Sequence, residues 1–122
     1  MLTSSVARDF PQDYNTMVIL TAGEFGRQLT ANGNRGTDHG RGNHMFVIGP
    51  KVRGGLYGDI FPEAEIARYD QPSADIDGLT SIERLFGSIV DWMQPGSASL
   101  VFPQMGASDL EPGVDFSSLL IS

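Results

Sequence analysis

Two short apolar runs, residues 16–21 and 44–48, enclose a long polar stretch. Each run is continuous rather than alternating and is bounded by turn-forming residues, which is typical of strands buried on both faces of a parallel sheet. The stretch between them, residues 22–43, holds six glycines and the turn signal Asn32-Gly33, and this predicts a loop. Long loops in compact domains are usually functional or disordered, and sites in α/β proteins lie at strand ends. Residues 22–43 are therefore the first place to look for a site.

The clearest helical pattern covers residues 80–93, where apolar residues recur on one face. Thr80 is the expected N-cap, and Glu83 follows it at the capping-box spacing. A shorter pattern predicts the last turns of a helix at residues 3–10, just before a proline. Residues 63–69 predict one or two further helical turns. Together these elements indicate an α/β fold with a small sheet, few helices and long loops.

The predicted elements are too few for a complete domain of this class. A parallel sheet that is covered on both faces needs several strands joined by crossover helices. Two strands and one clear helix do not supply them, and the apolar residues 119–121 also need a partner to cover them. We therefore expect residues 1–122 to form a single domain that pairs with another chain or with a missing N-terminal segment, as the C-terminal portion of a larger domain.

The composition excludes several classes of protein. The chain has no cysteine, which excludes disulfides, zinc–thiolate sites and cysteine nucleophiles. No apolar run approaches the roughly 18 residues that span a bilayer, so no membrane segment is expected. Residues 1–5 lack the basic start and the apolar core of a signal peptide, and the chain as it stands is predicted to be cytoplasmic.

The charge is negative overall but unevenly distributed. The net charge is −7, from 15 acidic against 8 basic residues, and a field of this sign repels nucleic acid and anionic membranes. Residues 26–53 are the exception, with five basic residues and one acidic residue. A basic loop in an acidic protein suggests an anionic ligand, and the alternative is ordinary variation of surface charge.

Candidate metal ligands gather in the polar stretch. Glu24, Asp38 and His39 combine two carboxylates with an imidazole, a set that can coordinate a divalent metal such as Zn²⁺, Mn²⁺ or Ca²⁺. His44 is an additional candidate ligand. The two neighbouring residues can converge only if they lie in a loop, because adjacent side chains of a strand point apart. In the alternative interpretation, Asp38 caps a turn and His39 is a surface residue.

Arginines supply the candidate anion contacts. Arg27 and Arg41 could each hold a phosphate or sulfate oxygen pair through parallel hydrogen bonds. The structural alternative pairs Glu24 with Arg27 and Asp38 with Arg41, so that these residues only hold the loop. The glycines fit neither a Walker loop nor a dinucleotide-binding fingerprint, and no nucleotide site is expected.

Several short motifs carry a family resemblance. They are Glu24-Phe25-Gly26-Arg27, Asn32-Gly33, Gly36-Thr37-Asp38-His39-Gly40, and Val52-Arg53-Gly54-Gly55 with Gly58. With this spacing the chain resembles the C-terminal part of the domain-of-unknown-function 1501 family, a branch that looks like the alkaline phosphatase/sulfatase superfamily. Gln28 departs from the family pattern, which usually has threonine there.

The resemblance implies a three-layer α/β/α sandwich with a metal site at the carboxyl ends of its strands. By that analogy Glu24, Asp38 and His39 are metal ligands and Arg27 contacts an anion. The superfamily's nucleophile and first metal ligands lie N-terminal to such a segment and are absent from these 122 residues. A typical family member would also be exported.

The expected function is therefore that of a sulfatase- or phosphatase-like protein. The chain would contribute part of a divalent-metal site for the hydrolysis of phosphate or sulfate esters, incomplete on its own. The alternative is a non-catalytic binding or structural module that recognises a partner or an anionic glycan.

Overall fold

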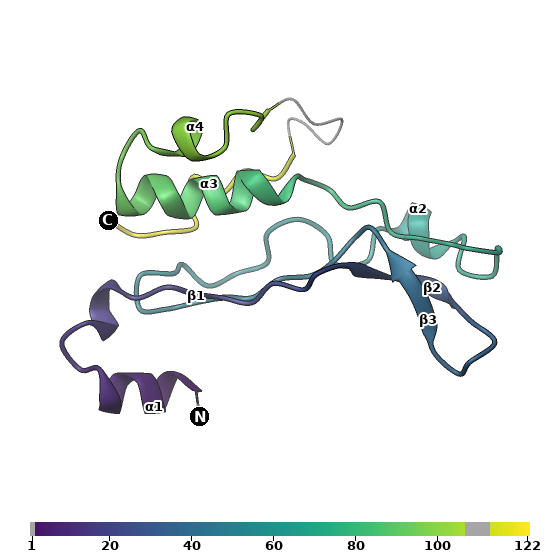
Figure 1. Ribbon diagram of the computed structural model, residues 1–122, viewed down its shortest axis with the longest axis horizontal. Coiled ribbons are helices and arrows are strands. Elements are labelled where there is room, and N and C mark those ends of the chain that lie inside the picture. Colours follow the sequence, from purple (N-terminus) through teal and green to yellow (C-terminus); the bar gives the residue numbers. More distant parts are fainter. Residues whose placement is uncertain (1, 107–112) are drawn as a thin grey trace.

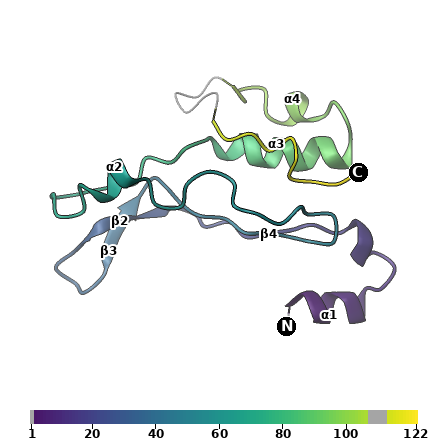
Figure 2. The same ribbon diagram turned by 180° about the vertical axis from the view of Figure 1, so that it is seen from behind.

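The computed structural model describes residues 2–106 and 113–122, and it shows a small, elongated α/β chain (Figure 1). A thin ribbon of two strands runs along its length, with a projecting hairpin at one end. Two helices lie along one side of the ribbon, and the N-terminal helix lies on the other side (Figures 1 and 2). None of the helices in the described part of the chain is long and apolar enough to cross a membrane.

The N-terminal helix, α1, runs from Leu2–Asp9 and confirms the helix predicted there. It ends where predicted, because Pro11 follows and the Phe10 amide makes the last helical bond, to the Val6 carbonyl at 2.8 Å. A short 3₁₀ turn, η1 (Tyr14–Thr16), then leads into the ribbon.

The ribbon pairs β1 (Ile19–Leu20) with β4 (Val47–Ile48) in antiparallel register, with Ile19 opposite Ile48. The two apolar runs therefore do form strands, but the predicted parallel sheet is wrong. Both strands are only half-buried. The pairing is antiparallel because residues 21–46, which connect β1 to β4, turn back through a hairpin. A parallel pair would need a crossover element in this connection.

The hairpin replaces the loop that was predicted at residues 22–43. β2 (Gly26–Ala31) pairs with β3 (Thr37–Gly40), again antiparallel, with Arg27 opposite His39. Glycine and asparagine signalled a loop, yet they serve here as the turn and as points of close backbone approach. The described residues thus contain two small antiparallel sheets with helices, and the three-layer sandwich is not confirmed.

Three helices follow the ribbon. α2 (Glu63–Ile66) and α3 (Ile82–Met93) confirm the helical patterns, and α4 (Ala98–Val101) packs on α3. The N-cap of α3 is Ser81 rather than the predicted Thr80, whose Oγ1 is buried without a hydrogen-bond partner among the described residues. Asp91 of α3 accepts a 2.7 Å bond from the Ala98 amide and so caps the start of α4.

The C-terminal segment is sandwiched between α3 and the stretch that follows β4. The Arg53 amide donates to the Leu119 carbonyl at 2.8 Å, and the Ile121 amide donates to the Lys51 carbonyl at 2.7 Å. On its other side, Trp92 Nε1 donates to the Ile121 carbonyl at 3.0 Å. Of the apolar residues 119–121, Leu119 is thus buried within the chain, whereas Ile121 stays 42% exposed.

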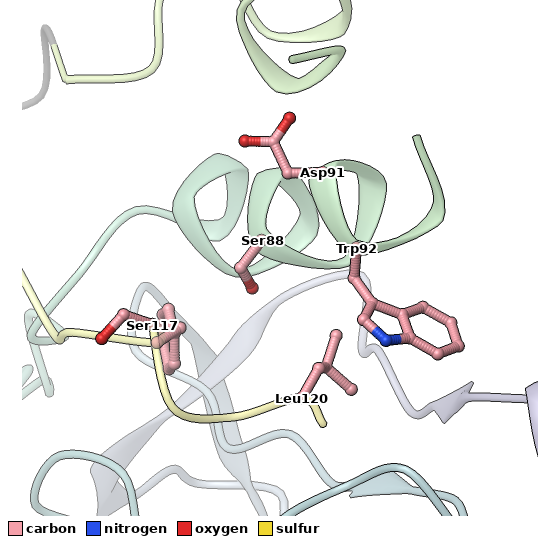
Figure 3. Close-up of a pocket in the computed structure, with 6 residues that line it drawn as sticks. Ser88, Asp91, Trp92, Ser117 and Leu120 are labelled. Atoms are coloured by element: carbon pink, nitrogen blue, oxygen red, sulfur yellow. The ribbon is translucent and has the colours of Figure 1, made fainter. Parts of the chain in front are cut away.

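A shallow hollow of about 320 Å³ remains between α3 and this segment (Figure 3). Ser88 and Leu120 face it, whereas the Asp91 side chain points to the opposite side of the helix (Figure 3). Beside it, the Ser117 amide and hydroxyl donate to Asp115 at 2.8 and 3.0 Å, and these bonds hold the pKa of the Asp115 carboxyl below its usual range. The hollow is a packing gap without converging reactive groups.

The core is small for the length of the chain. Its buried apolar residues in the described part are Ala74, Ile76, Leu85, Ala98 and Leu119. The accessible surface is 8437 Å², whereas a compact monomer of this mass exposes about 6,400 Å². Many large apolar side chains stay exposed, including Phe46, Leu56 and Leu100. The chain therefore leaves apolar surface that its own elements do not cover.

Substitution of Leu85 tests whether the core lies where α3 is buried. Because this side chain is buried between α3 and its neighbours, Leu85→Ala should lower the free energy of unfolding by about 2–3 kcal/mol. Leu100→Ala is the matched control, since Leu100 is 81% exposed and its truncation should change stability by less than about 0.5 kcal/mol. Urea denaturation followed by circular dichroism measures both. Equal losses would contradict the location of the core.

Candidate functional site

The hairpin is held from its outer edge by residues 69–77. The Leu29 amide donates to the Ala74 carbonyl at 2.8 Å, and the Gly42 amide donates to the Ile76 carbonyl at 2.6 Å. Further along β2, Thr30 Oγ1 lies within hydrogen-bond distance of two carbonyls of the same segment. The segment after α2 therefore fixes the orientation of the hairpin, although no sequence pattern linked the two.

Asp75 is the centre of this attachment. Its carboxylate accepts the Arg41 amide at 3.0 and 3.1 Å and the Ile76 amide at 2.8 Å. Arg41 Nε lies 3.8 Å from the same carboxylate, and the guanidinium also pairs with Asp77. The Asp75 side chain is only 19% exposed, so these bonds replace its lost hydration.

This arrangement changes the interpretation of Arg41. The side chain was predicted to bind an anion or, alternatively, to pair with Asp38. Among the described residues it pairs instead with Asp75 and Asp77. The predicted Asp38–Arg41 pair is wrong because the acidic segment at 75–77, distant in sequence, lies closer to the guanidinium. Arg41 holds the base of the hairpin.

Two glycines at the hairpin base are required by close packing. A Cβ on Gly40 would lie 2.5 Å from Asp75 Oδ1, and a Cβ on Gly42 would lie 2.5 Å from the Ile76 carbonyl oxygen. Real Cβ atoms do not approach other atoms so closely, so only glycine fits. The glycine content of this stretch therefore has a structural explanation, and no phosphate cradle is needed to account for it.

Asn32 organises the turn of the hairpin. Its Oδ1 accepts the amides of Asn34 and Gly36 at 2.9 and 3.1 Å, and its Nδ2 donates to Asp38 Oδ1 at 2.9 Å. Arg35 takes a left-handed conformation, with φ of 64°, to complete the turn. Asp38, a predicted metal ligand, is thus a hydrogen-bond acceptor on one side of the turn.

Asp38 also borders a polar hollow of about 340 Å³ on the same side of the hairpin. The hollow is lined by Gln28, Thr30, Ala31, Asn32, Asp38, Asp70, Pro72 and Ser73. Asp70 was not predicted as a site residue, and its position next to β2 could not be inferred from the irregular pattern of residues 59–78. The hollow is open, polar and acidic, which favours a cationic or hydrogen-bonding group over an anion.

The other predicted residues of the hairpin form an aromatic stack. The rings of His39 and Phe25 lie parallel, with centroids 3.6 Å apart, and the Arg27 guanidinium lies 5.0 Å from the Phe25 centroid. Arg27 Nη1 donates to the Thr37 carbonyl at 2.7 Å. The predicted Glu24–Arg27 pair is wrong in the described structure, because the guanidinium instead reaches across to β3. Arg27 and His39 therefore brace the hairpin.

His44 lies outside the hairpin. Its Nε2 is 2.5 Å from the Ile60 carbonyl oxygen, and its ring meets the edge of Phe61 with centroids 5.2 Å apart. A carbonyl can only accept, so Nε2 is the donor in this contact and Nδ1 keeps its lone pair. His44 fastens the ribbon to the stretch before α2.

The predicted metal ligands do not converge within this chain. Asp38 and His39 are neighbours on β3, so their side chains leave the strand on opposite faces. Across the described ranges, no three carboxylate or imidazole side chains gather closely enough to hold a metal ion. Glu24, Asp38 and His39 thus do not form a complete donor set here, and metal binding by them stays a prediction that needs ligands from elsewhere.

The fold and the hairpin define a class: a small α/β protein whose polar, glycine-rich hairpin is fixed by an acidic segment. A family model described as "Protein of unknown function (DUF1501)" matches residues 12–77, which include the ribbon, the hairpin and the segment that holds it. This match covers more than half of the chain, so the chain belongs to that family, as its motifs predicted. Comparison with curated proteins and with solved structures finds no match.

Asp75 provides the sharpest test of the site's architecture. Asp75→Ala removes the acceptor of two backbone amides and the partner of Arg41, and should lower the free energy of unfolding by about 2 kcal/mol. Asp70→Ala, which removes the same charge from the same segment, should change stability by less than about 0.5 kcal/mol. Denaturant titration of both variants compares them directly. A loss of equal size in both would refute the specific role of Asp75.

Proposed function

We propose that this chain supplies the polar hairpin of a phosphatase- or sulfatase-like hydrolase site, which protein outside these residues completes. The proposal rests on one observation. Three sets of contacts fix the hairpin that carries Asp38, but within the described residues Asp38 does not belong to a group of three side chains that could hold a metal ion. The Asp75 attachment, the Asn32 turn and the Phe25 stack all hold the backbone that carries Asp38. Rigid support of this kind is what a positioned functional group needs.

The chain's own residues set a limit on its chemistry. Ester hydrolysis needs a nucleophile and a positive group that stabilises the developing charge. Arg41 pairs with two carboxylates but its side chain stays 73% exposed, and Arg27 uses one guanidinium nitrogen for the Thr37 carbonyl. Anion binding by these two arginines stays a prediction. Protein outside these residues would have to bring the nucleophile.

A second candidate is a non-catalytic module that binds a partner, and a different observation favours it. The accessible surface exceeds that of a compact monomer by roughly 2,000 Å², which is more than the roughly 800 Å² that one partner contributes to a standard interface. The exposed Phe46, Leu56 and Phe61 contribute to this surface. On this account the hairpin is a rigid recognition element, for a protein or for a glycan.

The first proposal predicts no turnover by the chain alone. The purified 122-residue chain should not hydrolyse an aryl phosphate or an aryl sulfate above the buffer blank, with or without added divalent metal, because the family resemblance places the nucleophile N-terminal to this segment. A chromogenic assay measures this. Turnover that persists through repeated purification and disappears in His39→Ala would overturn the proposal.

Metal titration separates the two candidates. If the hairpin is part of a metal site, calorimetry with Zn²⁺, Mn²⁺ or Ca²⁺ should detect weak binding that Asp38→Ala abolishes. Glu63→Ala is the charge-matched control, since Glu63 lies exposed on α2 and does not line the hollow next to Asp38, and its loss should leave binding unchanged. A binding module without a metal role predicts no heat for any of the three proteins. Equal weakening in both variants would show only a response to net charge.

A further inference from the structure

The turn of the hairpin contains a chemically reactive pair, Asn32-Gly33. Of the asparagines in the chain, at positions 15, 32, 34 and 43, only Asn32 precedes a glycine. An asparagine carboxamide can be attacked by the backbone nitrogen of the next residue, and glycine hinders this approach least because it lacks a side chain. Nothing lies within 4 Å of the position that a Gly33 Cβ would take. Gly33 is itself exposed, so the attacking nitrogen belongs to a residue at the surface of the turn.

The backbone nitrogen of Gly33 is also not committed elsewhere. The hydrogen bonds of the turn involve other groups. The Asn32 amide donates to the Gly36 carbonyl at 2.7 Å, and the Asn34 and Gly36 amides donate to Asn32 Oδ1. Within the described ranges, the Gly33 amide itself makes no hydrogen bond. Its proton is consequently accessible to a base from the solvent.

The carboxamide of Asn32 is held in an environment that suits this attack. Addition to its Cγ places negative charge on Oδ1, and two backbone amides already donate to that oxygen at 2.9 and 3.1 Å. Donors fixed where charge develops stabilise the intermediate without rearrangement. The leaving nitrogen, Nδ2, is held 2.9 Å from Asp38 Oδ1. The turn thus binds both ends of the group that reacts.

We propose that Asn32 is a site of spontaneous deamidation in the folded chain, independently of any hydrolase-like role. Solvent base removes the Gly33 amide proton, and the nitrogen forms a bond to Asn32 Cγ. The Cγ–Nδ2 bond then breaks, and the nitrogen takes up a proton from water and leaves as ammonia. Water opens the resulting cyclic imide at either carbonyl, which gives aspartate or isoaspartate. No oxidant or reductant is consumed.

The reaction would change the turn that carries Asp38. The product has a carboxylate where Nδ2 stood, so the 2.9 Å donor to Asp38 is lost and two negative groups face each other. Isoaspartate would in addition lengthen the backbone at the head of the turn. Deamidation therefore removes one of the supports of the hairpin and adds a negative charge to a chain that already carries −7.

Peptide mapping by mass spectrometry tests the proposal on the full chain. After incubation in mildly alkaline buffer, Asn32 should convert several-fold faster than Asn15, Asn34 or Asn43 in the folded chain. It should also convert no more slowly in the folded chain than in the same chain unfolded in urea. Slower conversion in the folded chain would mean that the turn protects Asn32, and this would overturn the proposal, as would faster conversion at another asparagine.

Two alanine variants provide matched controls in the same turn. Gly33→Ala should slow conversion at Asn32 several-fold, because the methyl group obstructs the attacking nitrogen while the space around it accommodates the fold. Gly36→Ala should retain the rate, since its Cβ would lie 3.9 Å from Asn32 Oδ1 and outside the reacting pair. An unchanged rate in Gly33→Ala would exclude the cyclic imide. The aged chain and Asn32→Asp should both unfold at lower urea concentration than the fresh chain, and equal stability would refute the role of the Asn32–Asp38 bond.

Discussion

The contact between Asp75 and Arg41 is the constraint on which the arrangement of the hairpin depends. It joins residues 34 positions apart in the sequence, through the backbone of Arg41 as well as through its guanidinium. An isolated two-stranded hairpin is marginally stable in water, so β2 and β3 need an external attachment. Ala74 and Ile76, on either side of Asp75, belong to the small apolar core. The polar contacts of Asp75 and the burial of its two neighbours therefore hold the same short segment against the hairpin.

The distribution of buried and exposed residues bears on function as much as the hairpin does. The chain forms well-defined local elements, but few of its large side chains are removed from water. Hydrophobic burial is the main favourable term in folding, and an α/β domain of this length normally achieves more of it. Both functional candidates account for the exposed apolar surface. In one, the rest of a hydrolase domain covers it, and in the other a binding partner covers it. In either case the polar hairpin would project from the covered body.

The sequence predicted local elements well and long-range geometry poorly. The periodic apolar positions of α3 identify a helix because they report directly on which face is buried. The ribbon was located correctly, but its direction was not, because a continuous apolar run is compatible with either pairing. The hairpin was predicted as a loop because the sequence does not distinguish a glycine needed for close backbone packing from a glycine needed for a turn. Asp75 carried no signal at all, because its partner lies in another segment of the chain.

The same limits apply to the candidate site. Residue types indicated that Asp38 and His39 could act together, provided that both lie in a loop. Once they lie on a strand, alternation separates them, and this outcome depends on the pairing of β3 with β2. Arg27 and Arg41 were predicted to contact an anion, and within the described residues they contact the Thr37 carbonyl and the carboxylates of Asp75 and Asp77. The family assignment succeeded because it rests on the order and spacing of several motifs and not on the chemistry of any one.

The ribbon of β1 and β4 has a consequence for how the chain behaves in solution. In the described residues neither strand pairs with a third one, so each has an outer edge of peptide groups without a strand partner. Such edges can template the addition of a foreign strand, which is the usual beginning of aggregation. A larger sheet would cover them with further strands. In this chain the net charge of −7 opposes the approach of a second copy, so solubility should depend on ionic strength, and salt that screens the repulsion should favour edge-to-edge association.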